Sequence, residues 1–391
     1  MIANSIKRAL GVLASLPIIA SAQAVQGVTP TEILLGMHAD LSGPAASFGV
    51  PVANAFRMRI DEENAKGGIH GRKIRLIVED SQYQVPRAVQ AANKLISHDK
   101  VFAFVGAAGT PMNNAALPLQ QKAGIPNLFP ITWASSMSEP VNPLKYAIYQ
   151  PYQEQIKSGL SYMIGKKGKK AVCAMYQDTD FGRDVFDGVQ AYLKSANLPL
   201  VASASHRATE QDFTAAISKL RDAKCDLIAL GTIVRDTIVP YSTARKMGWN
   251  DVDFIGAASS YDLTVSGAQG GATEGLYATG FFDPPYRDTA NPAVARWFDA
   301  YKARFNADPA IQAAVGQVIM DLTIRALHDA GKDLNTQTLA TAFERINGYQ
   351  DMFNGPLQSI TPTSHASARS SIIYVVKDGR WTRVSESSGQ K

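Results

Sequence analysis

The sequence contains few of the residues and motifs that mark an enzyme or a metalloprotein. Its 391 residues include two cysteines and six histidines, and neither type recurs at the spacing of a metal site. The glycine-rich phosphate loops and the G-x-S-x-G and H-E-x-x-H signatures of hydrolases are also missing. We therefore expect no catalytic residues, no metal and no cofactor.

Long apolar runs are missing beyond residues 1–24, which have the pattern of a signal peptide. Lys7 and Arg8 form a basic region, residues 9–20 are apolar, and residues 22–24 read Ala-Gln-Ala, a cleavage sequence. The apolar stretch is too short to span a bilayer, although an uncleaved anchor is the alternative. We predict cleavage after Ala24 and a periplasmic location. We expect no lipid anchor, because there is no cysteine at the cleavage point.

Excess charge is small as well. The formal net charge is +5, and removal of Lys7 and Arg8 with the leader leaves 5 − 2 = +3. So small a charge gives no reason to expect nucleic acid or a membrane surface as a partner. Apolar residues make up 46% and charged residues 19%, which indicates an ordinary globular protein. The length favours two domains over one core.

Cys173 and Cys225 lie in or beside predicted strands of the same half of the chain. An exported protein meets an oxidising compartment, in which a disulfide can form. The pair forms no C-x-x-C motif. We expect two buried free thiols, with a disulfide as the alternative.

Short β-rich runs alternate with amphipathic stretches, and the pattern occurs twice. In the first half we expect strands at 32–37, 74–78, 101–105 and 125–129, and helices at 49–65, 86–97 and 112–123. In the second half we expect strands at 171–176, 200–205, 226–231 and from 254, helices at 182–196 and 212–223, and later helices at 293–304 and 315–330. This alternation predicts βαβ units with parallel sheets, an α/β fold of two Rossmann-like doubly wound lobes.

The loops at the carboxyl ends of the strands are the candidate sites, because open α/β sheets bind ligands there. Four of these loops carry suggestive residues, at 42–49, 106–111, 132–136 and 178–182. Phe48, Trp133 and Phe181 place an aromatic side chain in loops of both halves. Aromatic walls with a few polar anchors suit a small ligand, and packing in the core is the alternative.

Thr110 stands at the expected start of a helix. It precedes Pro111, which suits a first helical position, so we predict Thr110 as the N-cap. The N–H groups of Met112 and Asn113 would then lack partners within the helix. Such a helix end attracts anions, and plain capping without a ligand is the alternative.

Together these residues resemble a known family, the type I periplasmic binding proteins of the branched-chain amino-acid (Leu/Ile/Val-binding) class. The resemblance covers nearly the whole exported chain and rests on the order and spacing of several segments. These segments are 41–49, 64–73, 78–80, 88–95, 105–106, 123–126, 180–182, 212–213 and 355–357. The resemblance implies two lobes joined by three hinge segments, with the ligand enclosed between them.

The resemblance also implies boundaries for the two lobes. Lobe 1 would comprise residues 28–150 and 282–355, and lobe 2 residues 151–281 and 356–391.

Roles for individual residues follow from the same resemblance. Thr110 falls where the family has a hydroxyl residue that binds the ligand carboxylate, and Phe48 and Phe181 fall where aromatic residues enclose the ligand. Thr132 and Trp133 lie in the loop that supplies a second anchor. These five residues and Ser259 are our predicted ligand-binding residues.

One departure from the family pattern concerns the charge of the ligand. Amino-acid binders place an acidic residue after the strand that here includes Phe254, whereas this chain has Ala-Ala-Ser-Ser at 257–260, including Ser259. A buried ammonium without a counter-charge is costly. Asp262 is a candidate replacement. We expect an aromatic or other apolar carboxylic acid without an α-amine, and a branched-chain amino acid is the alternative.

Two further departures concern the first lobe. Trp133 replaces a small hydroxyl residue, which would reshape the pocket. Tyr83 and Gly109 occupy the places of a disulfide that the family carries.

The implied function is that of a monomeric solute-binding component of an ABC importer, which delivers a small carboxylate to a membrane permease. A periplasmic receptor subunit that senses a ligand on the same fold is the main alternative. A periplasmic enzyme is a weaker one, because no set of acid and base residues is evident.

Overall fold

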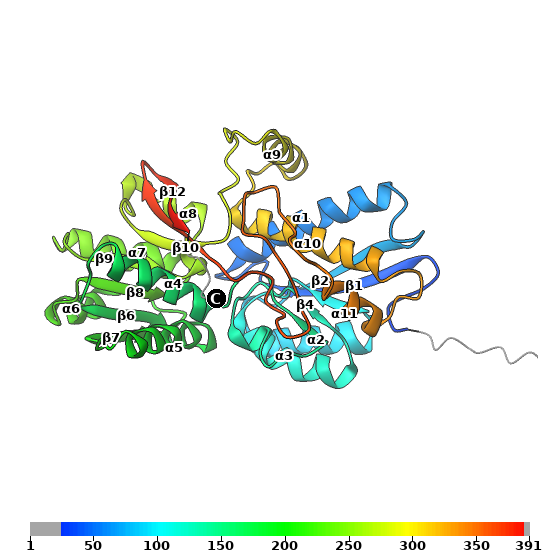
Figure 1. The fold of residues 1–391 in the computed structure, drawn as a ribbon, viewed down its shortest axis with the longest axis horizontal. Helices are drawn as coiled ribbons and strands as arrows, with labels where there is room; N and C mark the ends of the chain where they lie inside the picture. The colour runs from blue at the N-terminus through cyan, green and yellow to red at the C-terminus, as the bar shows by residue number, and fades with distance from the viewer. Residues whose placement is uncertain (1–24, 387–391) are drawn as a thin grey trace, which may run out of the picture.

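The computed structural model describes residues 25–386, so the predicted signal peptide lies outside the described residues. Two lobes stand side by side, each built on its own sheet (Figure 1). Within residues 25–386, every helix is too short or too polar to cross a membrane.

Lobe 1 contains a five-stranded parallel sheet in the order β2-β1-β3-β4-β5. Helices α1 and α10 pack together on one side, and α2 packs with α3 on the other (Figure 1). The strands are β1 (Glu32–Ala39), β2 (Lys73–Asp80), β3 (Ala103–Val105), β4 (Asn127–Leu128) and β5 (Lys145–Tyr146). The helices are α1 (Ala46–Ala65), α2 (Val85–Ser97), α3 (Thr110–Ala123), α9 (Pro292–Phe305), α10 (Ile311–Asp329) and α11 (Thr336–Phe343).

Lobe 2 contains a seven-stranded sheet in the order β12-β11-β10-β9-β8-β6-β7. Its strands are parallel except for β11 and β12, which the chain adds after returning from lobe 1. The strands are β6 (Val172–Gln177), β7 (Ala202–His206), β8 (Leu227–Gly231), β9 (Asp253–Gly256), β10 (Tyr277–Gly280), β11 (Ile372–Lys377) and β12 (Arg380–Glu386). The helices are α4 (Tyr152–Gly165), α5 (Asp180–Ser195), α6 (Thr214–Asp222), α7 (Val234–Lys246) and α8 (Leu263–Ser266).

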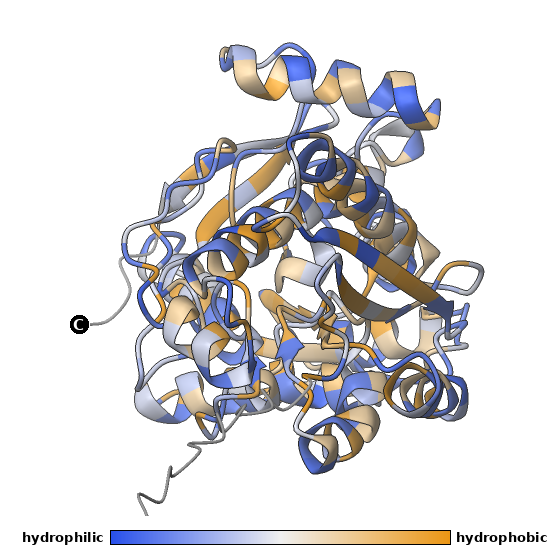
Figure 2. Ribbon diagram, turned by 90° about the vertical axis from the view of Figure 1, so that its right-hand side faces the viewer, coloured by the Kyte–Doolittle hydropathy of each residue, from blue (hydrophilic) through white to orange (hydrophobic). Residues whose placement is uncertain are grey.

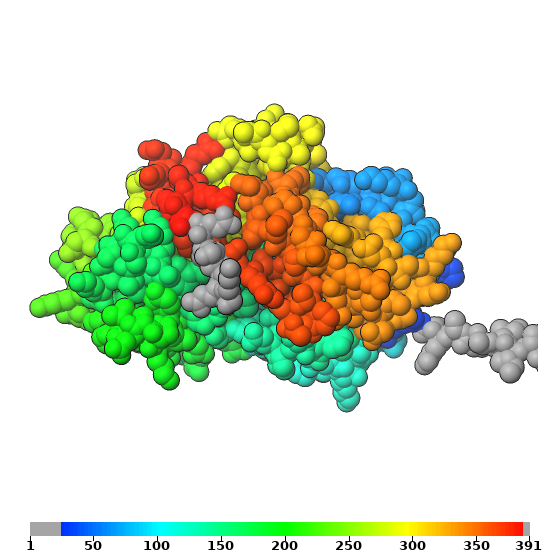
Figure 3. Space-filling view, viewed as in Figure 1, coloured from blue at the N-terminus to red at the C-terminus, as the bar shows by residue number. Residues whose placement is uncertain are grey.

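The chain passes between the lobes three times, at 147–151, 281–291 and 344–371. The third segment pairs with the first, because Ala147 N donates to His365 O at 2.9 Å. It also pairs with the second, because Asp283 N donates to Phe353 O at 2.9 Å. In Figure 3 the orange part of the chain lies across the face between the lobes. The predicted α/β fold of two lobes joined by three segments is confirmed, while the lobe boundaries stay a prediction.

The central strands are buried on both faces. All five residues of β8 are buried, as are seven of the eight residues of β1. Strands covered on both sides by helices are apolar throughout rather than alternating, which is typical of parallel sheets. Figure 2 shows strands drawn largely in orange between helices that carry both orange and blue.

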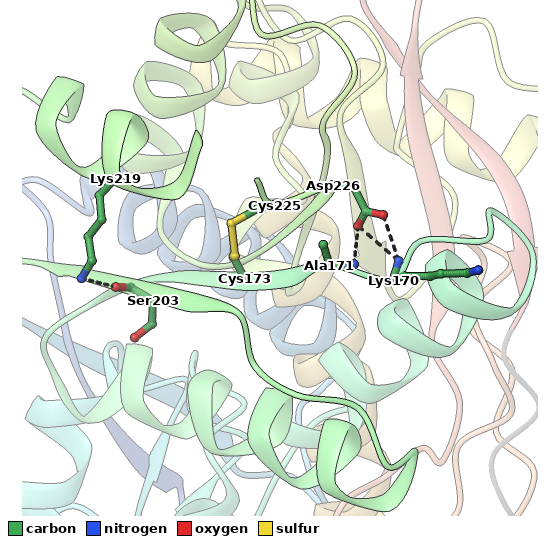
Figure 4. Close-up of a disulfide and its surroundings, with 7 residues drawn as sticks. All are labelled: Lys170, Ala171, Cys173, Ser203, Lys219, Cys225 and Asp226. Carbon is green, nitrogen blue, oxygen red and sulfur yellow. Dashed lines mark hydrogen bonds between the residues drawn. A yellow bond between two sulfur atoms is a disulfide. The ribbon is translucent and has the colours of Figure 1, made fainter. Parts of the chain in front are cut away.

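The two cysteines form a disulfide, so our expectation of free thiols is wrong (Figure 4). Cys173 lies on β6 and Cys225 just before β8, and their Cα atoms are 5.9 Å apart. These strands are parallel neighbours, although a helix, a strand and a second helix separate them in sequence. Next to the bridge, the carboxylate of Asp226 accepts hydrogen bonds from the backbone of Lys170 and Ala171 at 3.0 and 2.9 Å. The disulfide therefore joins strands that the parallel sheet brings together.

Candidate functional site

A narrow cavity lies between the lobes, at the carboxyl ends of their strands. This is where open α/β sheets place their ligands. It is lined by Ala45, Phe48, Tyr83, Ala108, Gly109, Thr110, Ile131, Thr132, Trp133, Tyr152, Phe181, Ile233 and Ser259. All six residues that we predict from the sequence are among them, and that they bind a ligand stays a prediction.

On the lobe 1 wall, two threonines form a polar pair. Thr110 opens α3, Thr132 follows β4, and their Oγ1 atoms are 2.5 Å apart. Both residues are buried. Thr110 is not the N-cap, contrary to our prediction, because the preceding Gly109 accepts the first helical hydrogen bond, from Asn113 N at 3.0 Å. The Thr110 hydroxyl therefore bonds across the cavity wall instead of to its own helix.

Gly109 allows this arrangement through its backbone conformation. Its φ of 89° lies in the left-handed region that favours glycine. A Cβ at this position would lie 3.2 Å from Cε2 of Tyr83 and closer still to Met112. Glycine thus lets the ring of Tyr83 lie against the start of α3.

Aromatic rings form the part of the cavity next to the crossing segments. The ring of Tyr152 lies 5.7 Å from that of Trp133 and 5.0 Å from that of Phe181, measured between centroids. Phe281 packs behind Trp133 at 4.7 Å. Burial raises the pKa of Tyr152 far above its ordinary value, so its phenol keeps its proton. The indole Nε1 of Trp133 is buried and, within the described residues, has no hydrogen-bond partner.

The lobe 2 wall is more apolar. Phe181 lies in the first turn of α5, Ile233 precedes α7, and Ser259 lies in the short 3-10 turn η2 (Ala258–Ser260) after β9. The Oγ atom of Ser259 is buried without a partner in the described part of the chain. This wall therefore offers a ligand two apolar side chains and one free hydroxyl.

The electrostatics of the cavity come from helix ends rather than from charged side chains. Four lining residues lie at helix N-termini: Ala45 at α1, Thr110 at α3, Phe181 at α5 and Ile233 at α7. Each such end carries a partial positive charge and unpaired N–H groups. The thirteen lining residues include no Asp, Glu, Lys, Arg or His. The wall itself thus carries no charged side chain. Behind it, burial and the nearby carboxylates of Asp236 and Asp40 raise the pKa of Tyr83.

Asp262, our candidate for the missing acid, does not line the cavity. Its Oδ1 accepts from Thr264 N at 2.8 Å and caps α8. Burial raises its pKa, which disfavours its charged form. Asp262 is therefore no replacement for the acidic residue of amino-acid binders. In residues 25–386, no group of three metal-ligating side chains could hold an ion.

Polar contacts join the lobes beside the cavity. Asn114 Nδ2 on α3 donates to Asp180 Oδ2 on α5 at 2.8 Å, and Ser135 Oγ donates to Asp184 Oδ1 at 2.8 Å. Burial raises the pKa of Asp184, although its hydrogen bonds act against this shift. These contacts hold lobe 1 against lobe 2 beside the cavity.

Besides Ile131, three side chains of the wall were missed from the sequence. Tyr83 follows β2, Ile233 follows β8, and Tyr152 opens α4 after the first crossing segment. The first two obey the same rule as the predicted residues, since both follow the carboxyl end of a strand. Applying that rule to β2 and β8 would have found them, whereas Tyr152 carries no local signal.

Comparison with known proteins agrees with this geometry. The sequence matches the model of the periplasmic binding protein family over residues 32–380. Leu/Ile/Val-binding protein homolog 7 of Brucella abortus (strain 2308) is 24% identical over 301 residues, which cover 74% of this chain and 75% of that protein. The chain belongs to the periplasmic binding protein family, in its type I, branched-chain amino-acid class.

Two solved structures share the fold. A fatty acid ABC transporter substrate-binding protein from Thermomonospora curvata superposes with a TM-score of 0.83 at 21% identity, over 94% of this chain and 95% of that one. The second is a solute-binding protein of an ABC transporter from Rhodopseudomonas palustris BisB5, in complex with 3,4-dihydroxybenzoic acid. It superposes with a TM-score of 0.79 at 20% identity, over 92% of this chain and 98% of that one.

Proposed function

We propose that this protein is the periplasmic solute-binding component of an ABC importer, and that it captures a small carboxylate by closure of its lobes. The observation that carries this proposal is the cavity at four helix N-termini, with two buried threonine hydroxyls and no charged side chain. The proposal includes export after cleavage at Ala24, a monomer, a membrane permease as partner and no chemical reaction. A receptor subunit that senses the same ligand is the second candidate.

Within this function, we favour a carboxylic acid without an α-amine over a branched-chain amino acid. An ammonium in this cavity would lose its water and meet no carboxylate, which costs several kcal/mol in proteins. A carboxylate would instead meet the hydroxyls of the threonine pair at the start of α3. Contrary to our prediction, the N–H group of Asn113 is already bonded there, to Gly109 O. The fatty-acid and dihydroxybenzoate binders with the same fold support this choice by analogy alone.

Affinity would come from both walls together. Burial of roughly 150 Å² of apolar ligand surface contributes about 4 kcal/mol before ordering costs. Each charge-assisted hydrogen bond at the threonine pair adds about 1.5–3 kcal/mol. Phe181 and Ser259 meet the ligand only when lobe 2 closes, so the ligand shifts the population toward the closed form.

The test is titration calorimetry on protein that has been unfolded, dialysed and refolded to remove bound solute. The probes are benzoate, 4-methylpentanoate and leucine, and the expected result is micromolar or tighter binding of an acid with little binding of leucine. Tight binding of leucine alone would refute our choice of ligand. Binding of none of the carboxylates would refute the proposed function. The genes next to this one, for a permease or for a membrane receptor, separate importer from sensor.

A further inference from the structure

Ser259 and its neighbour Ser260 have opposite surroundings in the turn that follows β9. Ser260 Oγ hydrogen-bonds to Thr237 Oγ1 at 2.9 Å inside lobe 2. Ser259 is 2% exposed, lines the cavity, and its Oγ has no partner within residues 25–386. One serine of the pair therefore supports the fold, and the other lines the cavity and carries a buried hydroxyl that has no partner within residues 25–386.

The turn itself is fixed in place. Gln155 Oε1 on α4 accepts from Ala258 N at 3.0 Å. Gly256 has no Cβ, which would otherwise lie 2.3 Å from Ser260 Oγ, so the chain can turn tightly after β9. A buried hydroxyl without a partner is unfavourable, and native structures rarely retain one without a reason. The fold thus holds Ser259 rigidly in an unfavourable state that a ligand atom could relieve.

A second unpartnered group narrows the chemistry of that ligand atom. Trp133 is 1% exposed and lines the same cavity, and its Nε1 has no partner in the described residues. An indole N–H can only donate a hydrogen bond. A hydroxyl such as that of Ser259 can donate or accept. A ligand oxygen can partner either group, whereas an ammonium cannot partner the donor Nε1. The oxygen is uncharged, because the carboxylate is already assigned to the threonine pair.

We infer that Ser259 determines specificity by binding an uncharged oxygen of the ligand, a hydroxyl or a carbonyl, from the lobe opposite the carboxylate anchor. The ligand class is then a hydroxylated or keto carboxylic acid rather than a purely apolar one. This inference rests on the proposed function and deepens it. Sites that hydrogen-bond a ligand oxygen discriminate strongly against the analogue that lacks it, because their own polar groups are then left unpaired.

The test measures two matched ligand pairs by calorimetry. The pairs are 4-hydroxybenzoate with benzoate, and 4-methyl-2-oxopentanoate with 4-methylpentanoate, and they are titrated into wild type, Ser259→Ala and Ser259→Thr. The matched control is Ser205→Ala, because Ser205 is an exposed serine of the same lobe. Thermal melting checks that each variant is folded.

In wild type we expect one oxygen-bearing probe to bind at least tenfold tighter than its partner, a preference that Ser259→Ala reduces to about twofold. Ser259→Thr keeps a hydroxyl and should retain part of the preference, and Ser205→Ala should retain all of it. Equal binding within both pairs, or a preference that survives in Ser259→Ala, overturns the role of Ser259 and leaves carboxylate capture intact. No binding by any of the four acids overturns both proposals.

Discussion

The two lobes share one architecture, but they present different walls to the cavity. The lobe 1 wall contains the bonded hydroxyls of Thr110 and Thr132, whereas the lobe 2 wall contains Phe181, Ile233, the phenol of Tyr152 and the unpartnered hydroxyl of Ser259. Both walls consist of helix N-termini beyond parallel strands, so the backbone contributes similarly to each. The difference lies in side chains: lobe 1 is suited to anchor a polar group, and lobe 2 to cover the apolar remainder.

The interiors of the lobes differ as well. Lobe 2 is cross-linked by the disulfide, and its buried His206 bonds through Nε2 to Asp236 Oδ2 at 3.0 Å. Lobe 1 contains the fully buried His38, whose two ring nitrogens have no partner in residues 25–386. We therefore expect oxidation state to control the stability of lobe 2 and acidity to control that of lobe 1.

The largest effect should come from removing the disulfide. Cys173 and Cys225 are 52 residues apart, and a loop of this length gives about 3–4 kcal/mol of stabilisation. Cys173→Ala with Cys225→Ala should lower the free energy of unfolding by this amount, measured in guanidinium. Reduction of wild type should produce a similar loss. If neither treatment changed the unfolding midpoint, the contrast between the lobes would lose its main support.

His38 should give the next largest effect, and it depends on pH. Burial lowers the pKa of His38 from 6.5 to about 4, so the unfolded chain binds more protons between these values. His38 thus contributes stability above pH 6.5 that is lost as the pH falls toward 4, roughly 3 kcal/mol in all. His38→Leu should flatten stability against pH in this window.

Substitutions on the two walls should distinguish binding of the ligand carboxylate by lobe 1 from burial of its apolar part by lobe 2. Thr110→Val removes a buried hydroxyl and should weaken carboxylate binding by about 1–3 kcal/mol. Phe181→Ala should weaken binding of both members of each probe pair without unfolding the protein. Calorimetry and melting together provide the check. Unchanged affinity in Thr110→Val would remove that residue from the site, and a large melting loss in Phe181→Ala would assign Phe181 to the core.

The smallest effect should come from the contact between the lobes. Asn114→Ala removes the hydrogen bond to Asp180, and exposed polar pairs of this kind contribute about 0.2–1 kcal/mol. Ligand affinity should fall by up to about fivefold, because closure becomes less favourable. Asn93→Ala removes an exposed asparagine on α2 that bonds within its own helix, and it should leave affinity unchanged. Equal effects of the two variants would argue against Asn114 as a closing contact.

Much of the site was predictable because the rule that locates it is local. The six predicted residues follow predicted strands and line the cavity, namely Phe48, Thr110, Thr132, Trp133, Phe181 and Ser259. Tyr152 was not predictable in this way, because it follows a crossing segment and reaches the cavity only through the path of the chain. The N-cap of α3 was assigned one residue too late, because the conformation of Gly109 rather than the Thr110 hydroxyl starts the helix.

The sequence by itself determined most strands and helices of both halves, since hydrophobic periodicity and turn residues act over a few neighbours. It therefore determined the α/β class and the loops that carry the site. It did not determine β5, α4, β10 or α11. Only the tertiary structure decided which distant residues meet: Cys173 with Cys225, Thr110 with Thr132, and Asn114 with Asp180. Those pairings depend on the order of strands in the sheets and on lobe closure, which no local pattern encodes.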